Sequence, residues 1–347
     1  LEKSELLDRE IRRAAEKRGW VLLRLGARPF EREPVGAHIH VGSVRDSATA
    51  VRIQNGMARY APALAALMAN SPVYRRRAGE YKSYRVASFA EYCSMPQTIA
   101  EPDFWQQDWG GDVCAKLSWG STVELRVCDG VSSTRLMCET IVLVAGLMSH
   151  VAEACESAGP TVDEYREIFV NRWRAAKYGL QAVFEWNGAE VPVDELLTSM
   201  VALAQDGMGR LGTAGDDLRI IRSMLRKRQT QADFQLAVFS KEKGDAHRYT
   251  RTMANIQRDP SAFEKYLRRA PVLAAVEPGD HLEDILSSIE VETTYPVLVR
   301  RTPLSPVQLE AALERPTNMP GRLKDSTVTS NNALPLKFAI STKAPCF

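Results

Sequence analysis

The stretch Thr122-Val-Glu-Leu-Arg-Val-Cys-Asp129 alternates between aliphatic and charged or polar side chains. This alternation predicts a β-strand over residues 121–127, in which residues two apart share a face. Glu124 and Arg126 then lie on the polar face, and the aliphatic residues between them pack inward. A carboxylate that can ligate Mg²⁺ would stand beside a guanidinium that can bridge phosphate oxygens. Taken alone, the pattern is more typical of an ion pair on an exposed sheet face.

A second short strand is predicted upstream, over Ala37-His-Ile-His-Val41, between Gly36 and Gly42. Its two histidines, His38 and His40, share a face because they are two residues apart. Paired imidazoles can hold a divalent metal or contact phosphate oxygens. The alternative is a pair of surface histidines on an amphipathic strand, and the pattern does not decide between the two.

A basic, tyrosine-rich segment extends from Asn70 to Arg85, with five cations, three tyrosines including Tyr81, and a flexible point at Gly79. Such a segment suits an anion-binding lid. The alternative is a solvated basic loop, which composition alone favours. Its irregular composition, shared with the residues up to Ser118, predicts loops throughout 73–118.

Two helical segments carry further cations. In Asn171-Arg-Trp-Arg-Ala-Ala-Lys-Tyr-Gly-Leu180, Arg174 and Tyr178 are four residues apart and would project together, although a plain helix surface explains them equally well. The cationic segment 219–228 is better interpreted as a solvated helix face than as a nucleic-acid site.

The remaining pattern predicts an α+β protein, with strands early and helices late. Before residue 122, helices are expected over 5–18 and from a cap at Ser43 or Asp46 to about Tyr60, with a kink or restart at Pro62, and a buried strand over 20–25. After Asp129, helices are expected over 133–157, 161–174, 193–205, 216–228, 246–258 and 261–269, and from Ser305-Pro306, followed by a tail from about 316.

Composition narrows the class of protein. The chain has 347 residues, 45 % of them hydrophobic, and 45 Lys and Arg against 43 Asp and Glu. A net charge of +2 gives no long-range field for nucleic acid or an anionic membrane. The most apolar stretch, 140–149, is about half of the ~20 residues that a membrane span needs, so a core helix is expected. Six scattered cysteines without a Cys-x-x-Cys pair fit a reducing cytoplasm.

Taken together and in order, these segments resemble one family. Residues 36–41, Ala69-Asn-Ser-Pro72, 79–85, 122–129 and 171–180 are similar to the carboxylate–amine ligases of the glutamate–cysteine ligase family 2 type, which are related in fold to glutamine synthetase. The resemblance spans roughly residues 9–236. It implies an antiparallel sheet whose polar concave face holds ATP and divalent cations. It also implies a reaction in which a carboxylate, typically the γ-carboxylate of glutamate, is activated as an acyl phosphate and an amine displaces the phosphate.

The resemblance also implies roles for individual residues. Glu124 would be a Mg²⁺ ligand and Arg126 a phosphate contact, and His38 would lie at the metal. The predicted ATP-binding residues are His38, His40, Asn70, Arg85 and Arg126. Arg85 and Arg126 would act in catalysis, and Tyr81, Arg174 and Tyr178 would bind the amino-acid and amine substrates.

The chain departs from the family pattern in several places. Members begin with a glutamate-rich strand, and no Glu-Glu run precedes Trp20. The chain is also short between Arg28 and Gly36 and again between Tyr84 and Trp119. Asp112-Val-Cys114 stands where relatives often carry Asp-x-Arg. Since residue 1 is Leu, we expect a further segment, including that strand, upstream of the sequence.

Two interpretations of the whole chain remain open at this point. One is an ATP- and Mg²⁺-dependent ligase, with a catalytic domain over 1–270 that is helical from about 131 and an extension of unknown role over 271–347. The other is a catalytically reduced, ligase-like binding or scaffold subunit. For the enzyme we expect a homo-oligomer, or a partner chain that completes the site, in the cytoplasm and without nucleic-acid or membrane partners.

Overall fold

The computed structural model describes residues 2–42, 44, 46–89, 93, 111–116, 122–154, 162–212 and 218–276. Its strands are β1 (Ile39–Val41), β2 (Val73–Tyr74), β3 (Arg77–Ala78), β4 (Val113–Lys116), β5 (Thr122–Leu125), β6 (Val183–Trp186) and β7 (Ala189–Pro192). Its helices are α1 (Glu2–Glu16), α2 (Ser47–Leu67), α3 (Tyr84–Ser88), α5 (Thr134–Glu153), α6 (Val162–Tyr178), α7 (Val193–Arg210), α8 (Arg219–Lys227), α9 (Gln231–Lys241), α10 (Ala246–Ile256) and α11 (Ala262–Arg269), with a 3₁₀ turn, η3, over Gly179–Gln181.

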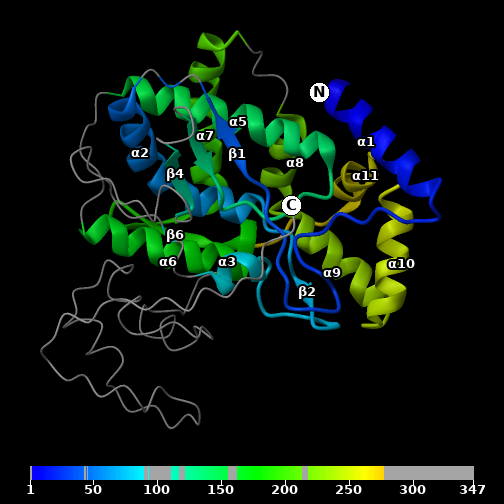
Figure 1. The fold of residues 1–347 in the computed structure, drawn as a ribbon. Helices are drawn as coiled ribbons and strands as arrows, with labels where there is room; N and C mark the ends of the chain where they lie inside the picture. The colour runs from blue at the N-terminus through cyan, green and yellow to red at the C-terminus, as the bar shows by residue number, and fades with distance from the viewer. Residues whose placement is uncertain are drawn as a thin grey trace, which may run out of the picture. The chain divides into compact units, whose positions relative to one another are not determined.

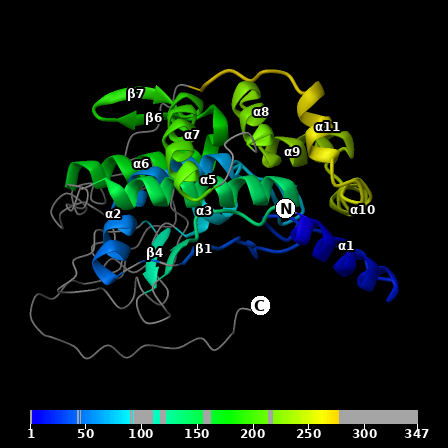
Figure 2. The ribbon, with the colours of Figure 1, turned by 90° about the horizontal axis from the view of Figure 1, so that it is seen from above.

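The three-stranded sheet is antiparallel, with the order β1-β5-β4 (Figure 1). Ile39 is paired with Leu125, which is paired with Val113 on the other side, so these apolar residues form one row on the inner face. That face packs on α2, and α2 and α5 in turn contact α7. Figure 2 shows the resulting order: strands β1 and β4 on one side, α5 and α6 in the middle, and α7 with the β6–β7 hairpin on the other side.

Helix α2 carries much of the core. Asp46 caps it by accepting a hydrogen bond from the backbone N–H of Thr49 at 2.7 Å. Of the two caps predicted, Ser43 and Asp46, the structure therefore has Asp46. The helix continues through Pro62 to Leu67, so the predicted kink or restart does not divide it. Its second half is rich in alanine and buried, which lets neighbouring elements approach closely.

Helices α5 and α7 cross at two glycines. A Cβ on Gly207 would lie 1.9 Å from the carbonyl oxygen of Gly146, so only glycine permits this approach. The sequence predicts a cap at Ser132 or Ser133 for this helix, and in the structure Ser133 caps α5. Within the described residues, α5 is the one helix long and apolar enough to cross a membrane, by length and composition alone; core helices pass the same test, and Leu143 and Leu147 of α5 are buried in this core.

Two hairpins surround the sheet layer. The β2–β3 hairpin turns at Arg75 and Arg76, both with positive φ, and Tyr74 stacks on Tyr84 with ring centroids 3.8 Å apart. The β6–β7 hairpin turns at Asn187-Gly188, whose φ values of 52° and 75° suit a two-residue hairpin turn.

The α+β class predicted from the sequence is confirmed, as are the two strands that carry the histidines and Glu124. The expected loop over 73–118 is wrong in part, because β2, β3, α3 and β4 lie within it. The hairpin β6–β7 and helix α9 were not predicted, although Asn187-Gly188 and the capping box of Thr230 with Asp233 signal them. Predictions on residues 155–161, 213–217 and 277–347 lie outside the described residues, and the domain division at residue 270 stays a prediction.

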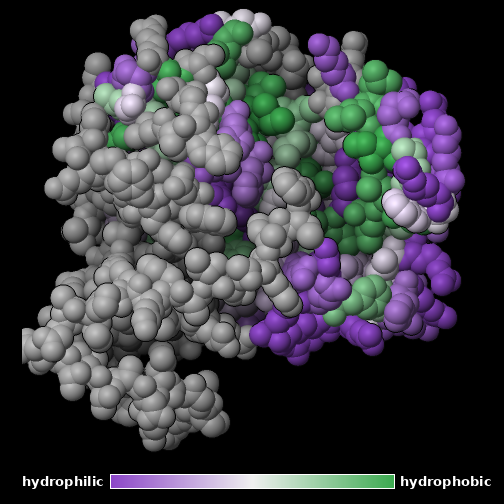
Figure 3. All heavy atoms as spheres, in the orientation of Figure 1, coloured by the Kyte–Doolittle hydropathy of each residue, from purple (hydrophilic) through white to green (hydrophobic). Residues whose placement is uncertain are grey.

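The predicted buried strand over 20–25 is wrong. This segment pairs with no strand among the residues that the structure describes, and the side chains of Trp20 and Val21 are exposed, at 65 % and 59 %. An apolar run without a neighbouring strand to satisfy its backbone cannot remain extended in a core. Nearby α1 also leaves Leu7 and Ile11 exposed. Figure 3 accordingly shows hydrophobic surface over the region of α1, bordered by hydrophilic residues.

Candidate functional site

The polar face of the sheet gathers ionisable side chains around one carboxylate. Glu124 is paired with His40 across β1 and with Cys114 across β4, so these three residues form one row on that face. Oε1 of Glu124 lies 2.9 Å from Nδ1 of His38 and 3.3 Å from Nε2 of His40. Oε2 of Glu124 lies 3.3 Å from Nζ of Lys116 and 3.8 Å from a terminal nitrogen of Arg126. We call these five residues, His38, His40, Lys116, Glu124 and Arg126, the Glu124 cluster.

The Glu124 carboxylate is buried, with 4 % of its side chain exposed. Burial by itself would raise its pKa, but the hydrogen bond from His38 and the charges of Arg126 and Lys116 outweigh burial and lower the pKa of Glu124 to about 2. Glu124 is therefore ionised at neutral pH. Its Oε2 is buried and accepts no hydrogen bond, and its contacts are the two ion pairs with Lys116 and Arg126.

The histidines are more accessible than the carboxylate they face. The side chains of His38 and His40 are 39 % and 49 % exposed. Because Nδ1 of His38 is directed at Glu124, Nε2 of the neutral ring carries a lone pair that can accept a bond. A carboxylate behind a histidine is the usual arrangement for orienting a metal-binding or phosphate-binding ring. The sequence predicts that His38 and His40 share a face and that Glu124 and Arg126 share a face, and in the structure the two pairs meet at the Glu124 carboxylate.

Strand β4 is held in place by a buried ion pair. Asp112, just before β4, accepts two hydrogen bonds from Arg172 of α6, at 2.6 Å and 3.2 Å, and its backbone carbonyl accepts one from the N–H of Arg126 at 2.7 Å. Arg172 also donates to the carbonyls of Val86 and Phe89. The Asp112–Arg172 pair thus fixes the positions of β4, of the Arg126 backbone and of the C-terminal end of α3 relative to α6.

Arg85, on α3, lies directly against the backbone of Gly36. A Cβ at Gly36 would lie 2.5 Å from Nε of Arg85, so glycine makes room for the guanidinium. Burial lowers the pKa of Arg85, and the charges of Asp129 and Asp112 oppose that effect. Both carboxylates are bonded to other groups, and among the described residues no hydrogen bond or ion pair reaches the Arg85 guanidinium. Gly36 is two residues before His38, so this cation lies at the start of the strand that carries the histidines.

Asp129 organises the segment that precedes Arg85. It accepts hydrogen bonds from the backbone N–H of Asn70 and the hydroxyl of Ser71, both at 2.7 Å, and from the hydroxyl of Ser83 at 2.9 Å. Ser83 in turn caps α3. Burial raises the pKa of Asp129 to about 6, although these hydrogen bonds and the charge of Arg85 act to lower it.

Asn70 lies in this buried network. It is fully buried, its amide donates to the carbonyl of Gly130 at 2.6 Å, and its own carbonyl accepts from Gly26 and Gln235. Asn70 therefore joins the segments that contain Gly26 and Gly130. Its predicted contact with ATP stays a prediction.

The predicted substrate residues are not all brought together. Arg174 is buried and forms an ion pair with Glu185 of β6 at 3.2 Å, while it also donates to the carbonyl of Val183. Tyr81 packs edge-on against Trp173 with ring centroids 5.1 Å apart. Tyr178 lies beside Lys177. The guanidinium of Arg174 is therefore already paired with Glu185 of the β6–β7 hairpin, and the predicted roles of Arg174, Tyr81 and Tyr178 in substrate binding stay predictions.

Two residues important to the geometry were not predicted. Lys116 was missed because β4 was interpreted as loop; the sequence signal was Gly-Gly-Asp at 110–112 followed by Val-Cys-Ala-Lys at 113–116. Arg172 lies inside a segment that the sequence analysis singled out, but its partner Asp112 is far away in the chain, so no local spacing reveals the pair.

The cluster is richer in cationic and imidazole groups than in carboxylates. Within the described residues, no group of three or more His, Cys, Asp or Glu side chains is arranged to hold a metal ion. A lysine, an arginine and two histidines around one carboxylate suit an anion such as a polyphosphate, and Glu124 would be the residue to hold a metal that accompanies that anion.

Comparisons with known proteins agree with the resemblance that the motifs suggest. A protein from Solibacter usitatus named "Putative glutamate--cysteine ligase 2" is 30 % identical over 237 residues, covering 60 % of this chain and 58 % of its own length. Proteins of the same name from Roseiflexus sp. and Janthinobacterium sp. are 29 % and 26 % identical, covering 59 % of this chain in both cases and 58 % and 60 % of their own lengths. The chain thus spans about three fifths of the length of the curated relatives it matches.

The family model for glutamate–cysteine ligase family 2 matches residues 31–113 and 115–250. The match includes β1, β5 and most of the supporting network, and it is interrupted at Cys114, in the strand where the chain departs from the family pattern. The matched residues make up well over half of the chain and contain the whole Glu124 cluster. The chain therefore belongs to glutamate–cysteine ligase family 2.

Proposed function

We propose that the protein is an ATP-dependent carboxylate–amine ligase. In this reaction a glutamate-like carboxylate takes the γ-phosphoryl group of ATP to form an acyl phosphate and ADP, and an amine then attacks the carbonyl and displaces phosphate. The observation that carries the proposal is the Glu124 cluster, where two histidines, a lysine and an arginine surround one ionised carboxylate. Membership of a family whose relatives are named ligases supports it.

The cations of the cluster suit phosphoryl transfer. The reaction moves a phosphoryl group whose negative charge is spread over its oxygens, so catalysis depends on position and on nearby positive charge. Arg126 and Lys116 flank Oε2 of Glu124 and can turn toward phosphate oxygens while the strands hold their backbones fixed. His40, half exposed, offers a ring nitrogen beside them.

Glu124 is the residue that would hold Mg²⁺. Oε2 of Glu124 is one anionic oxygen ligand, and the ring of His38 contacts the other oxygen of the same carboxylate, with Nδ1 lying 2.9 Å from Oε1. Mg²⁺ often uses one or two carboxylates and takes its other ligands from water and from substrate phosphates. When bound there, Mg²⁺ with ATP supplies the phosphoryl group and neutralises its charge, and the chain's own residues supply the orientation.

Arg85 is the residue that we assign to the carboxylate substrate or to a phosphate. It is a desolvated cation without a hydrogen-bonding partner among the described residues, and it lies beside Gly36 at the start of the histidine strand. Guanidinium binds carboxylates and phosphates through two parallel hydrogen bonds. Tyr81 and Tyr178 remain proposed substrate contacts, and we propose a cytoplasmic, homo-oligomeric enzyme.

The test is an ATP turnover assay with the full-length protein. The protein is incubated with ATP, Mg²⁺, glutamate and a panel of amines, and ADP and phosphate are measured. We expect release that requires the carboxylate, an amine and Mg²⁺ together. Absence of turnover above background, together with absence of ATP binding by calorimetry, would falsify the proposal.

The second candidate is a ligase-like binding or scaffold subunit that has lost metal ligands. It is favoured by the finding that the described residues hold no group of three metal-ligating side chains. This candidate predicts that ATP binds but is not consumed, and that adding Mg²⁺ changes the ATP dissociation constant little. Turnover that depends on Mg²⁺ would eliminate it.

A further inference from the structure

The groove between α7 and α8 is a second place where cations gather, apart from the Glu124 cluster. Its volume is about 290 Å³, and it is lined by Asp194, Thr198 and Val201 of α7 and by Arg222, Leu225 and Arg226 of α8. Ligand sites in proteins begin at about this size, which suits a small ligand. The basic segment 219–228, interpreted from the sequence as a solvated face, supplies the two arginines.

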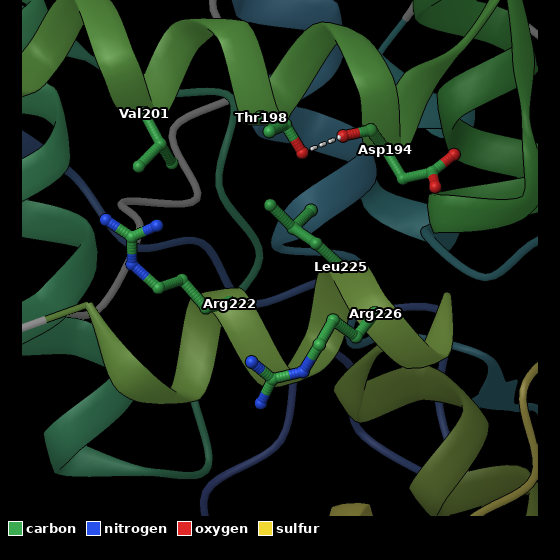
Figure 4. A pocket seen from close by; sticks show the side chains of 6 residues that line it. All are labelled: Asp194, Thr198, Val201, Arg222, Leu225 and Arg226. Carbon is green, nitrogen blue, oxygen red and sulfur yellow. Dashed lines mark hydrogen bonds between the residues drawn. The ribbon is translucent and has the colours of Figure 1, made fainter.

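The two arginines lie on the same face of α8. They are four residues apart, so their side chains are neighbours on the helix surface. Figure 4 shows both side chains leaning toward the N-terminal end of α8, with the guanidinium of Arg222 beneath Val201. Two like charges at this spacing destabilise an isolated helix by a few tenths of a kcal/mol. A negative group between them would remove that cost.

Within the described ranges, no acidic side chain is paired with either Arg222 or Arg226. Across the described part of the chain, neither guanidinium forms a hydrogen bond or an ion pair within 4.0 Å. The one carboxylate of the groove, Asp194, is already paired with Arg228 at 3.0 Å, and Figure 4 shows it directed away from Arg222. Among the residues that the structure describes, the groove therefore offers two guanidiniums without an acidic partner, and its one carboxylate is already paired.

The remaining wall supports a compact anion. Thr198 donates its hydroxyl hydrogen to the carbonyl of Asp194 at 2.7 Å, so its oxygen can still accept a hydrogen bond, such as one from a P–OH group. Val201 and Leu225 are buried and keep the floor of the groove apolar, which strengthens charge interactions above it. A tetrahedral group with several acceptor oxygens can bridge two guanidinium forks.

We propose that the α7–α8 groove binds a phosphate group, either free phosphate or a small phosphate monoester, through Arg222 and Arg226. The site is separate from the Glu124 cluster and does not depend on the proposed ligase activity.

The test is isothermal titration calorimetry of the full chain with inorganic phosphate in a phosphate-free buffer, at constant ionic strength. An Arg85→Gln, Lys116→Gln, Arg126→Gln background removes the cations that we assign to phosphate at the sheet, so that binding at the groove is measured apart from binding there. We expect saturable binding that falls at least 10-fold in affinity when Arg222→Gln or Arg226→Gln is added. The matched control is Arg219→Gln, an exposed arginine of the same helix outside the groove, which should leave affinity unchanged.

Methyl phosphate is the second probe. Binding equal to that of inorganic phosphate assigns the groove to phosphate monoesters, and loss of binding assigns it to free phosphate. The proposal is overturned if the Arg222→Gln, Arg226→Gln double variant binds phosphate as well as its parent, or if chloride at equal ionic strength produces the same heats. Circular dichroism of each variant confirms that the helices remain folded.

Discussion

At the residue scale, Glu124 is unusual because one buried carboxylate faces four basic side chains. The arrangement is tolerated because two histidines bond one oxygen while Lys116 and Arg126 approach the other. A buried charge without such partners would cost several kcal/mol. The same partners leave Oε2 without a hydrogen bond, and that oxygen is the feature on which the proposed metal contact rests.

Glu124→Gln tests this contact directly. The amide keeps the size of the side chain but removes its charge, so Mg²⁺-dependent ATP turnover should fall at least about 10-fold, as expected when a metal-binding group is lost. Far-ultraviolet circular dichroism should stay unchanged. The matched control is Glu190→Gln on the exposed strand β7, which should retain full turnover. Equal turnover in the Glu124→Gln variant and the parent would refute the role assigned to Glu124.

The buried pair Asp112–Arg172 makes a structural prediction. Asp112→Asn leaves the Arg172 guanidinium buried without its counter-charge, and such losses destabilise proteins by about 3–5 kcal/mol. Urea unfolding should show this loss. The exposed pair of Arg13 with Glu10 is the control, and Arg13→Ala should change the free energy of unfolding by at most about 1 kcal/mol. Similar effects of the two substitutions would show that the buried pair contributes little.

At the element scale, the positions of strands and helices depend on a few close contacts. Strand β5 pairs with both neighbours and so brings residues from 38 to 126 onto one face. The backbones of α5 and α7 approach each other closely at Gly146 and Gly207. Glu139 of α5 also accepts the backbone N–H groups of Ile220 and Ile221, which ties α5 to the start of α8.

The glycines of α7 give a matched pair of variants. Gly207→Ala places a Cβ 1.9 Å from the Gly146 carbonyl oxygen, so the helices must separate, and overpacking of this kind costs about 1–3 kcal/mol or more. Gly209→Ala on the same helix meets nothing within 4 Å and should gain up to about 1 kcal/mol from the better helix propensity of alanine. Thermal unfolding should therefore shift in opposite directions. A shift in the same direction would contradict the close packing.

At the scale of the whole molecule, three buried carboxylates set a pH dependence of stability. Burial raises the pKa of Glu139 to about 7 and that of Asp129 to about 6, whereas the partners of Glu124 lower its pKa to about 2 despite burial. A raised carboxyl pKa means that the folded state binds more protons than the unfolded chain, so stability falls as pH rises. The lowered pKa of Glu124 has the opposite effect, because its contribution to stability is lost as pH falls from about 4.5 toward 2.

The free energy of unfolding should therefore be highest near pH 4.5 for these groups and decline toward pH 7. The decline should be on the order of 1 kcal/mol or more, because one pKa unit corresponds to about 1.4 kcal/mol. Urea unfolding at constant ionic strength, at pH 4.5 and 7.5, measures it. Glu139→Gln should reduce the slope between pH 5 and 7. Stability that increases over this interval in the parent protein would contradict the assignment.

Much of the site follows from local pattern. The alternation in Thr122–Asp129 and in Ala37–Val41 determines which side chains share a face, because a strand turns successive residues to opposite sides. The capping signals at Asp46 and Ser133 likewise mark helices that the structure has. The order of these motifs also indicates the family, which the family model confirms.

The rest depends on contacts between distant residues. Whether Trp20–Leu25 is a strand depends on a partner that this fold does not supply, and Lys116 enters the cluster only because β4 pairs with β5. Arg174 is four residues from Tyr178 and was predicted to bind substrate, but in the structure its guanidinium forms an ion pair with Glu185 of the β6–β7 hairpin. Sequence by itself determined the faces of the strands, the helix starts and the family, because these follow from short-range geometry and motif order. Only the tertiary structure decided which charged side chains lie together in the candidate site and which are paired elsewhere, because burial and pairing are set by residues far apart in the chain.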